Sequence, residues 1–240
     1  MNNFEELFRL KLSELPRLPL TPVGIAVIDS GIDAALPQLR GRVANGQGNN
    51  DCCGHGTAVA GILAGLAPNA VIHDIKVLDE HGFGSGEALI EGFSRAIDSE
   101  AKLINMSLNC RRKYRTELMA LCDLAYRKDK IVIGAKCNLP LADDLGFPAE
   151  LATCIGVEPD AENNPFRVRY TGFPAIEFSA QGELIKVLRP GGGYRYQSGS
   201  SLAVPVVGGL LALLLGYAPD LKLFELKTLL KHYGEQQKCL

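Results

Sequence analysis

Short apolar runs that alternate with helix-like segments constrain the fold of this chain most strongly. The strand-like runs cover residues 23–29, 71–78, 102–107 and 131–135, and the helix-like segments cover 56–66, 85–100, 116–128, 200–215 and 223–233. Strands separated by helices of this length are typical of right-handed crossover connections, which place consecutive strands parallel in one sheet. Between residues 153 and 197 the pattern changes to short strands and Gly/Pro turns, with a hairpin expected around 190–193. We therefore predict an α/β fold with a mainly parallel central sheet.

Composition and charge exclude several classes of protein. The chain has 240 residues, 47% of them hydrophobic and 22% charged, which excludes a disordered chain. Its 25 basic and 27 acidic residues leave a net charge of -2, so we expect neither a nucleic-acid nor a membrane partner. A charge-free run, residues 202–218, contains Pro205, Gly208 and Gly209, which favours a buried helix over a membrane span. We expect Pro205 in the first turn of that helix, where a missing N–H costs little.

The N-terminus and the cysteines indicate a reducing compartment. The first residues, Met-Asn-Asn-Phe-Glu-Glu, lack the basic and apolar regions of a secretory signal. The seven cysteines are an odd number and form no zinc-like CxxC pairs. We therefore expect reduced thiols and a cytoplasmic location.

Three short motifs lie where predicted strands end or predicted helices begin. Asp29-Ser30-Gly31 follows the first strand, His55-Gly56-Thr57 opens the first helix, and Gly199-Ser200-Ser201 opens the long apolar helix. Each motif alone is typical of a turn or a helix cap. In a parallel sheet, strand C-termini and helix N-termini meet at one edge, where ligands bind. We therefore expect Asp29, His55 and Ser201 to lie together.

In the order Asp, His, Ser, these motifs resemble the subtilase family of subtilisin-like serine peptidases, from Val23 to Tyr217. The resemblance implies a three-layer α/β/α fold and a serine endopeptidase that works through an acyl-enzyme. It makes Ser201 the nucleophile, His55 its general base and Asp29 the residue that orients the imidazole. Residues 130–138 resemble the strand that ends in the family's oxyanion-hole asparagine, which implies that role for Asn138.

Two positions depart from the family pattern beside the substrate. The segment Ser107–Asn109 resembles the one whose backbone pairs with substrate, which implies substrate binding by Ser107, Leu108 and Asn109. At two positions where the family usually has glycine, this chain has Asn109 and Cys137. If these side chains face the S1 pocket, they narrow it and disfavour aromatic P1 residues. If both point away, the pocket keeps its width.

The resemblance also bears on metal ions. Between Leu63 and Ala70 the chain lacks the oxygen-rich insertion that binds structural calcium in many subtilases. We therefore expect no metal at that position and no cofactor. Asp143, Asp144 and Asp160 are an alternative cation site, although a solvated loop is the simpler interpretation.

The predicted boundary separates an N-terminal extension, residues 1–20, from a subtilisin-like peptidase domain, residues 21–240. The extension resembles those of intracellular subtilases, and we expect no pro-domain. Its stretch from Glu5 to Leu15 is amphipathic. That pattern allows either a helix packed on the body or an inhibitory strap.

The resulting hypothesis is a cytoplasmic serine endopeptidase whose partner is a peptide or protein substrate. The lack of secretion, the small size and a crowded S1 pocket favour limited processing of a specific peptide, such as leader removal, over bulk digestion. The alternative, from another class, is a catalytically silent subtilase-like module that binds a peptide or a protein. The intact set Asp29, His55, Asn138 and Ser201 argues against this alternative.

Overall fold

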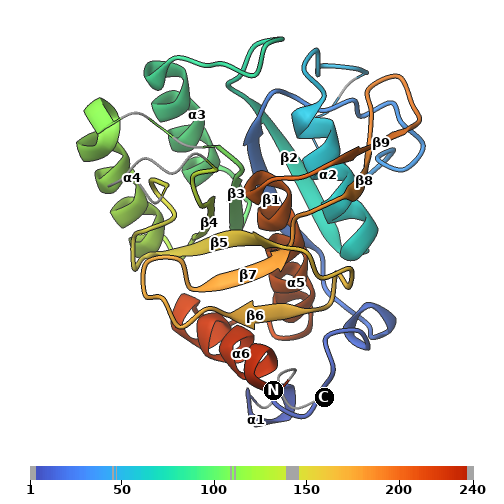
Figure 1. The fold of residues 1–240 in the computed structure, drawn as a ribbon, viewed down its shortest axis with the longest axis vertical. Helices are drawn as coiled ribbons and strands as arrows, with labels where there is room; N and C mark the ends of the chain where they lie inside the picture. The colour runs from blue at the N-terminus through green and yellow to red at the C-terminus, as the bar shows by residue number, and fades with distance from the viewer. Residues whose placement is uncertain are drawn as a thin grey trace.

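A seven-stranded sheet in the order β2-β1-β3-β4-β5-β7-β6 runs through the centre of the molecule (Figure 1). The structure, a computed structural model, describes residues 4–236 apart from 45, 47, 109, 111 and 139–145. The strands of the sheet are β1 (Val23–Asp29), β2 (Ala70–Lys76), β3 (Leu103–Met106), β4 (Ile131–Ala135), β5 (Cys154–Asp160), β6 (Val168–Tyr170) and β7 (Phe178–Gln181). Every neighbouring pair is parallel except β6 and β7. The mainly parallel sheet is therefore as predicted.

Helices cover both faces of the sheet, because successive residues of each central strand point to opposite faces. Ile25 and Val27 belong to one hydrophobic core, while Ala26 and Ile28 belong to a second core. The first core contains side chains of α2 (His55–Leu66), α5 (Ser200–Tyr217) and α6 (Leu223–Gln236); the second contains those of α3 (Gly86–Asp98) and α4 (Arg115–Arg127). Burial on both faces explains why β1 reads as a continuous apolar run. This arrangement confirms the predicted three-layer α/β/α fold.

Helix α5 is the long apolar segment of the sequence. It is long and apolar enough for a membrane span, but 89% of its 18-residue window is buried inside the fold. The prediction that Pro205 lies in the first turn is wrong, because α5 begins at Ser200 and Pro205 is its sixth residue. At that position proline cannot donate the helical hydrogen bond to the carbonyl of Ser201. This carbonyl therefore needs another donor.

The predicted hairpin around residues 190–193 is present. It joins β8 (Ile185–Leu188) to β9 (Tyr194–Gln197) in an antiparallel pair. Ile185 and Val187 of β8 pack with Ala58 of α2 and Leu202 of α5 in a small separate core. The hairpin therefore lies over the N-terminal ends of both helices, and β9 leads directly into α5.

The N-terminal stretch packs on the body through buried leucines. It does not form one helix from Glu5 to Leu15, because α1 covers only Phe4–Leu7 and a 3-10 turn follows at Leu15–Arg17. Leu7, Leu12 and Leu15 are at most 3% exposed and belong to the same core as α5 and α6. The predicted boundary after residue 20 stays a prediction.

Candidate active site

The C-terminal ends of β1, β3 and β4 lie side by side in the sheet, and several candidate residues lie at these ends or in the segments that follow them. Ile28 of β1 is paired with Met106 of β3, and Met106 is paired with Gly134 of β4. The residues that follow these positions therefore emerge side by side at the C-terminal edge of the sheet. Asp29 ends β1, and the segments that carry Ser107 and Asn138 follow β3 and β4.

Asp29 is fully buried and faces the imidazole of His55. His55 is the first residue of α2, and its Nδ1 lies 2.9 Å from both Oδ1 and Oδ2 of Asp29. The backbone N–H of Ser30 also donates to Oδ1 of Asp29, at 2.7 Å. A carboxylate only accepts hydrogen bonds, so Nδ1 of His55 carries a proton and Nε2 is left as the acceptor.

The other ring nitrogen of His55 reaches the hydroxyl of Ser201. Its Nε2 lies 3.0 Å from Oγ of Ser201, the second residue of α5 and 146 positions away in the chain. A continuous line of hydrogen bonds therefore joins Asp29, His55 and Ser201. The structure brings these three residues together, as the sequence analysis expected.

The charges around His55 act on its pKa in opposite directions. Burial is the largest effect and lowers the pKa, whereas the adjacent Asp29 carboxylate raises it by charge and by hydrogen bonding. Asp51 raises it further and Arg195 lowers it, and the net result is a pKa above the ordinary value. The site therefore stabilises the imidazolium of His55 more than water does.

The amide of Asn138 is held in one orientation. The N–H of Ser200 donates to Asn138 Oδ1 at 3.1 Å, and Ser200 Oγ lies 2.9 Å from the same oxygen. The Nδ2 group of Asn138 is therefore left to face Ser201. A methyl group placed on Gly199 would lie 3.4 Å from Ser201 Oγ, 3.6 Å from Asn138 Nδ2 and 4.0 Å from Ser201 N. The Nδ2 group of Asn138, the N–H of Ser201 and the hydroxyl of Ser201 thus border the same small space.

Ser107 supports the helix that carries Ser201. Its hydroxyl donates to the carbonyl of Ser201 at 2.7 Å, which supplies the hydrogen bond that Pro205 cannot make. Buried Asn105 in turn donates from Nδ2 to Ser107 Oγ at 2.9 Å. The Ser107 side chain, expected beside the substrate, therefore contacts the backbone of α5.

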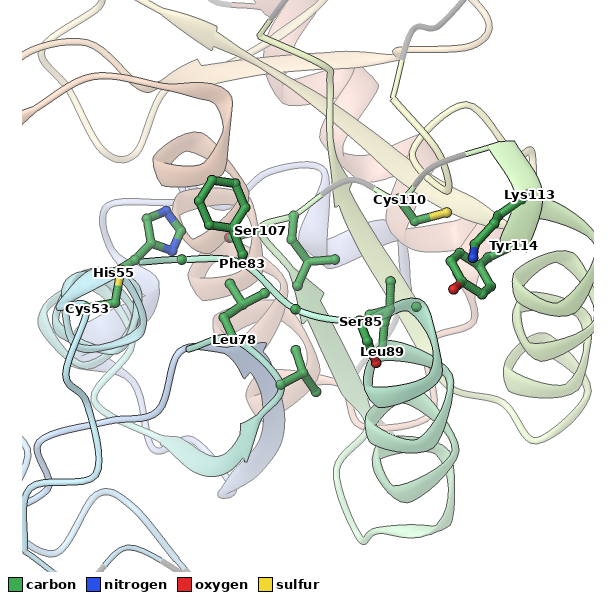
Figure 2. A pocket seen from close by; sticks show the side chains of 15 residues that line it. Cys53, His55, Leu78, Phe83, Ser85, Leu89, Ser107, Cys110, Lys113 and Tyr114 are labelled. Carbon is green, nitrogen blue, oxygen red and sulfur yellow. The ribbon is translucent and has the colours of Figure 1, made fainter. Parts of the chain in front are cut away.

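A cleft of about 940 Å³ opens beside His55 (Figure 2). One wall comes from the segment between β2 and α3 and the other from the segment after β3, and the lining includes Cys53, His55, Phe83, Ser107, Leu108 and Tyr114. Figure 2 shows His55 at one end and Lys113 with Tyr114 at the other. Ser107 and Leu108 both line this cleft, and their role in substrate binding stays a prediction.

The structure does not place the other two predicted substrate-binding residues, Asn109 and Cys137, in the cleft. Cys137 is half-buried next to Asn138 and is not part of the lining of this cleft. Asn109 lies outside the described residues. Their effect on the S1 pocket stays a prediction.

Within the described ranges, no group of three or more His, Cys, Asp or Glu side chains is arranged to hold a metal ion. Asp160 accepts a hydrogen bond from Ser179 and pairs with Arg169. The other two members of the alternative cation site, Asp143 and Asp144, lie outside the described residues.

The sequence analysis missed the residues whose hydrogen bonds fix the positions of the candidate residues. Asn105 and Ser200 position Ser107 and Asn138, and Asp51 binds the backbone at the start of α2. Ser200 belongs to the motif Gly199-Ser200-Ser201, where a serine is typical of a helix cap. Asp51 lies only four positions before His55. Asn105 stands out as a polar residue inside an apolar strand, but local pattern does not say which buried group it contacts.

Comparisons with known proteins agree with this geometry. The subtilase-family model matches residues 21–237. The cell wall-associated protease of Bacillus subtilis (strain 168) is 33% identical over 90% of this chain, and the match covers 26% of that protein. Subtilisin E of the same strain is 32% identical over 82% of this chain and 56% of its own length. The chain thus spans about a quarter to about half the length of these curated relatives.

A relative of more similar length and two solved structures extend the comparison. Subtilisin of Bacillus pumilus is 32% identical over 82% of this chain and 78% of its own length. A crystal structure of a lanthipeptide protease has a TM-score of 0.73 at 22% identity and covers 95% of this chain and 86% of that one. A cold adapted subtilisin-like serine proteinase has a TM-score of 0.67 at 23% identity, over 87% of this chain and 80% of that one. Both structures share the fold. The family model and the curated relatives together show that the chain belongs to the subtilase family.

Proposed function

We propose that this chain is a serine endopeptidase that hydrolyses peptide bonds through an acyl-enzyme, with Asp29, His55 and Ser201 as its catalytic triad. The observation that carries the proposal is the unbroken line of hydrogen bonds from the buried Asp29 carboxylate through His55 to Ser201 Oγ. A serine hydroxyl is a weak nucleophile unless a base within hydrogen-bond reach removes its proton. His55 Nε2, at 3.0 Å, meets that requirement.

The chemistry follows from these positions. His55 Nε2 accepts the proton as Ser201 Oγ forms a bond to the substrate carbonyl carbon, and the carbonyl π electrons move to oxygen. The resulting oxyanion accepts hydrogen bonds from Asn138 Nδ2 and the backbone N–H of Ser201. Protonated His55 then gives its proton to the leaving amine as the C–N bond breaks. Water, activated by the same nitrogen, hydrolyses the acyl-enzyme and restores Ser201.

Asp29 keeps the imidazole in the reactive tautomer throughout this cycle. Both of its oxygens lie 2.9 Å from Nδ1, so the proton stays on that nitrogen and the charge of the imidazolium is balanced. The substrate is proposed to bind as an added strand along Ser107–Asn109, with its side chains in the adjacent cleft. A volume of about 940 Å³ has room for several residues of an extended peptide.

Labelling with a fluorophosphonate probe tests the activity without knowledge of the cleavage motif. We expect labelling of the wild type at Ser201 and none of the Ser201→Ala variant. Because neutral His55 is the base and its pKa lies above its ordinary value, the labelling rate should reach half its plateau above about pH 6.5 and rise with pH. Absence of labelling in folded wild type would instead favour the silent peptide-binding module.

The processing role and the location are part of the same proposal. Limited processing follows if the Cys137 side chain, at a position where the family usually has glycine, narrows the S1 pocket and so restricts the choice of substrates. No disulfide joins the cysteines that the structure describes, which supports a reducing, cytoplasmic compartment. Cleavage of a peptide library, read by mass spectrometry, should show a few strongly preferred sites, whereas broad cleavage would contradict limited processing.

A further inference from the structure

Asp51 is a buried carboxylate that accepts five hydrogen bonds at the start of α2. It is 2% exposed. Its Oδ1 accepts from the backbone N–H groups of Cys53 and Gly54 at 3.1 and 2.7 Å and from the Ser30 hydroxyl at 2.9 Å. Its Oδ2 accepts from the N–H and the hydroxyl of Thr57 at 2.9 and 2.6 Å. Asp51 therefore satisfies N–H groups on both sides of His55 in the chain.

The same carboxylate ties the first turn of α2 to the end of β1. The N–H of Gly56 donates to Ser30 Oγ at 3.0 Å, and this hydroxyl donates onward to Asp51. Ser30 directly follows Asp29, and Gly56 directly follows His55. The bridge consequently fixes the distance between the two residues that form the Asp–His pair. Gly54, the N-cap residue of α2, has no side chain that could supply this connection itself.

The charged groups around His55 come from three elements. Asp29 at the end of β1 contacts the ring, Asp51 acts on it through the loop before α2, and Arg195 acts on it from β9. The Arg195 guanidinium donates to the carbonyl of Gly54 at 3.3 Å, while Asp51 accepts from the N–H of the same residue. The thiol of Cys53 lines the cleft beside the ring. Asp51 and Arg195 thus bind the N–H and the carbonyl of the same residue, and their charges have opposite effects on the pKa of His55.

We propose that Asp51 is a positioning residue for the reaction: it holds His55 between Asp29 and Ser201, and its negative charge stabilises the imidazolium that forms when His55 accepts the proton. The inference rests on the proposed peptidase function. It assigns to Asp51 two separable effects, one on the position of His55 and one on its protonation. The variant Asp51→Asn tests both, because it nearly preserves the shape of the side chain and removes the charge.

The effect on protonation can be measured without catalysis. The imidazole of His55 is titrated by NMR in a Ser201→Ala background, where the chain cannot digest itself. Asp51→Asn should lower the pKa of His55, because it removes a negative charge that favours the imidazolium. The matched control is Asp33→Asn, since Asp33 is also buried and also accepts two backbone N–H groups, yet is not one of the charges with the largest effects on the pKa of His55. An unchanged pKa in Asp51→Asn, or an equal fall in Asp33→Asn, overturns the proposal.

The effect on position is read from the fluorophosphonate labelling rate. At the pH plateau, Asp51→Asn should be slower than wild type by at least about tenfold, and its acid limb should move to lower pH by the shift seen in the titration. Asp33→Asn should stay within about twofold of wild type. A wild-type plateau rate in Asp51→Asn overturns the positioning role. If wild type is not labelled at all, the proposed function fails, whereas the titration still tests the link between Asp51 and His55.

Ser30→Ala keeps the inference testable if Asp51→Asn does not fold. This variant removes the bridge to Gly56 and leaves the Asp51 charge in place. We expect slower labelling than in Asp33→Asn, with the pKa of His55 unchanged. Labelling at the wild-type rate in folded Ser30→Ala contradicts the proposed bridge.

Discussion

The close packing of Gly56 against the end of β1 makes the substitution Gly56→Ala a sensitive test of the site geometry. A methyl group on Gly56 would lie 2.2 Å from the carbonyl oxygen of Gly31 and 3.2 Å from Cβ of Asp29. The first distance is about 1 Å shorter than an ordinary C···O contact of about 3.3 Å. Because the carbonyl of Gly31 is a backbone group that cannot rotate away as a flexible side chain would, the first turn of α2 must move by roughly that difference, and His55 moves with it.

The displacement sets the expected size of the effect. A misplacement of about 1 Å between reacting groups costs on the order of 100-fold in rate, so fluorophosphonate labelling of Gly56→Ala should slow by about that factor. Overpacking costs about 1–3 kcal/mol, and the better helix propensity of alanine returns up to about 1 kcal/mol. We expect the free energy of unfolding to fall by about 1–2 kcal/mol.

A second glycine of the same helix provides the control. Gly65 is exposed, and a methyl group there would have no neighbour within 4 Å. Gly65→Ala should label at the wild-type rate and raise the free energy of unfolding by about 0.5–1 kcal/mol. Urea denaturation and the labelling rate are measured on both variants. If Gly56→Ala matches Gly65→Ala in both quantities, the contact between α2 and β1 is not as close as described.

The remaining predictions concern the triad, the pocket and metal ions. Ser201→Ala and His55→Ala should each abolish peptidase turnover and leave the fold intact. Because the two residues act as a unit, the double variant should be scarcely less active than either single variant, and additive losses would contradict the assignment. Wild type should prefer small or polar P1 residues, and Cys137→Gly should raise kcat/KM selectively for large ones by about 5- to 150-fold; an unchanged P1 profile would place the thiol elsewhere. EDTA should leave the Tm and the activity unchanged, because residues 63–70 lack the calcium-binding insertion, and a large fall in Tm would show a bound cation.

Local sequence pattern was sufficient for the mainly parallel α/β sheet, whereas the three-layer arrangement was implied by the family resemblance. The runs at 23–29 and 131–135 coincide with β1 and β4, because a strand buried on both faces must be apolar throughout and is bounded by turn residues. The helix-like segment 85–100 corresponds to α3, and Ser85 caps this helix because its hydroxyl accepts from the N–H of Ala88. These features depend on contacts within a few residues.

The candidate site was predictable only in part. The positions of Asp29, His55 and Ser201 followed from strand and helix ends in a parallel sheet, but their roles came from the family resemblance. The spacing of 146 residues between His55 and Ser201 leaves no periodic signal, because the chain between them folds through six further strands of the sheet before it returns.

Tertiary structure alone decided how the site is supported. The carbonyl of Ser201, which Pro205 leaves without its helical donor, accepts from the hydroxyl of Ser107 in the segment after β3. Asp51 accepts from backbone N–H groups at the start of α2, whose N-cap residue is a glycine. Each of these partners is a common polar residue whose importance depends on which buried donor or acceptor lies opposite it. A buried polar group must find a partner, but the sequence does not say which distant segment provides it, because that follows from the packing of all three layers.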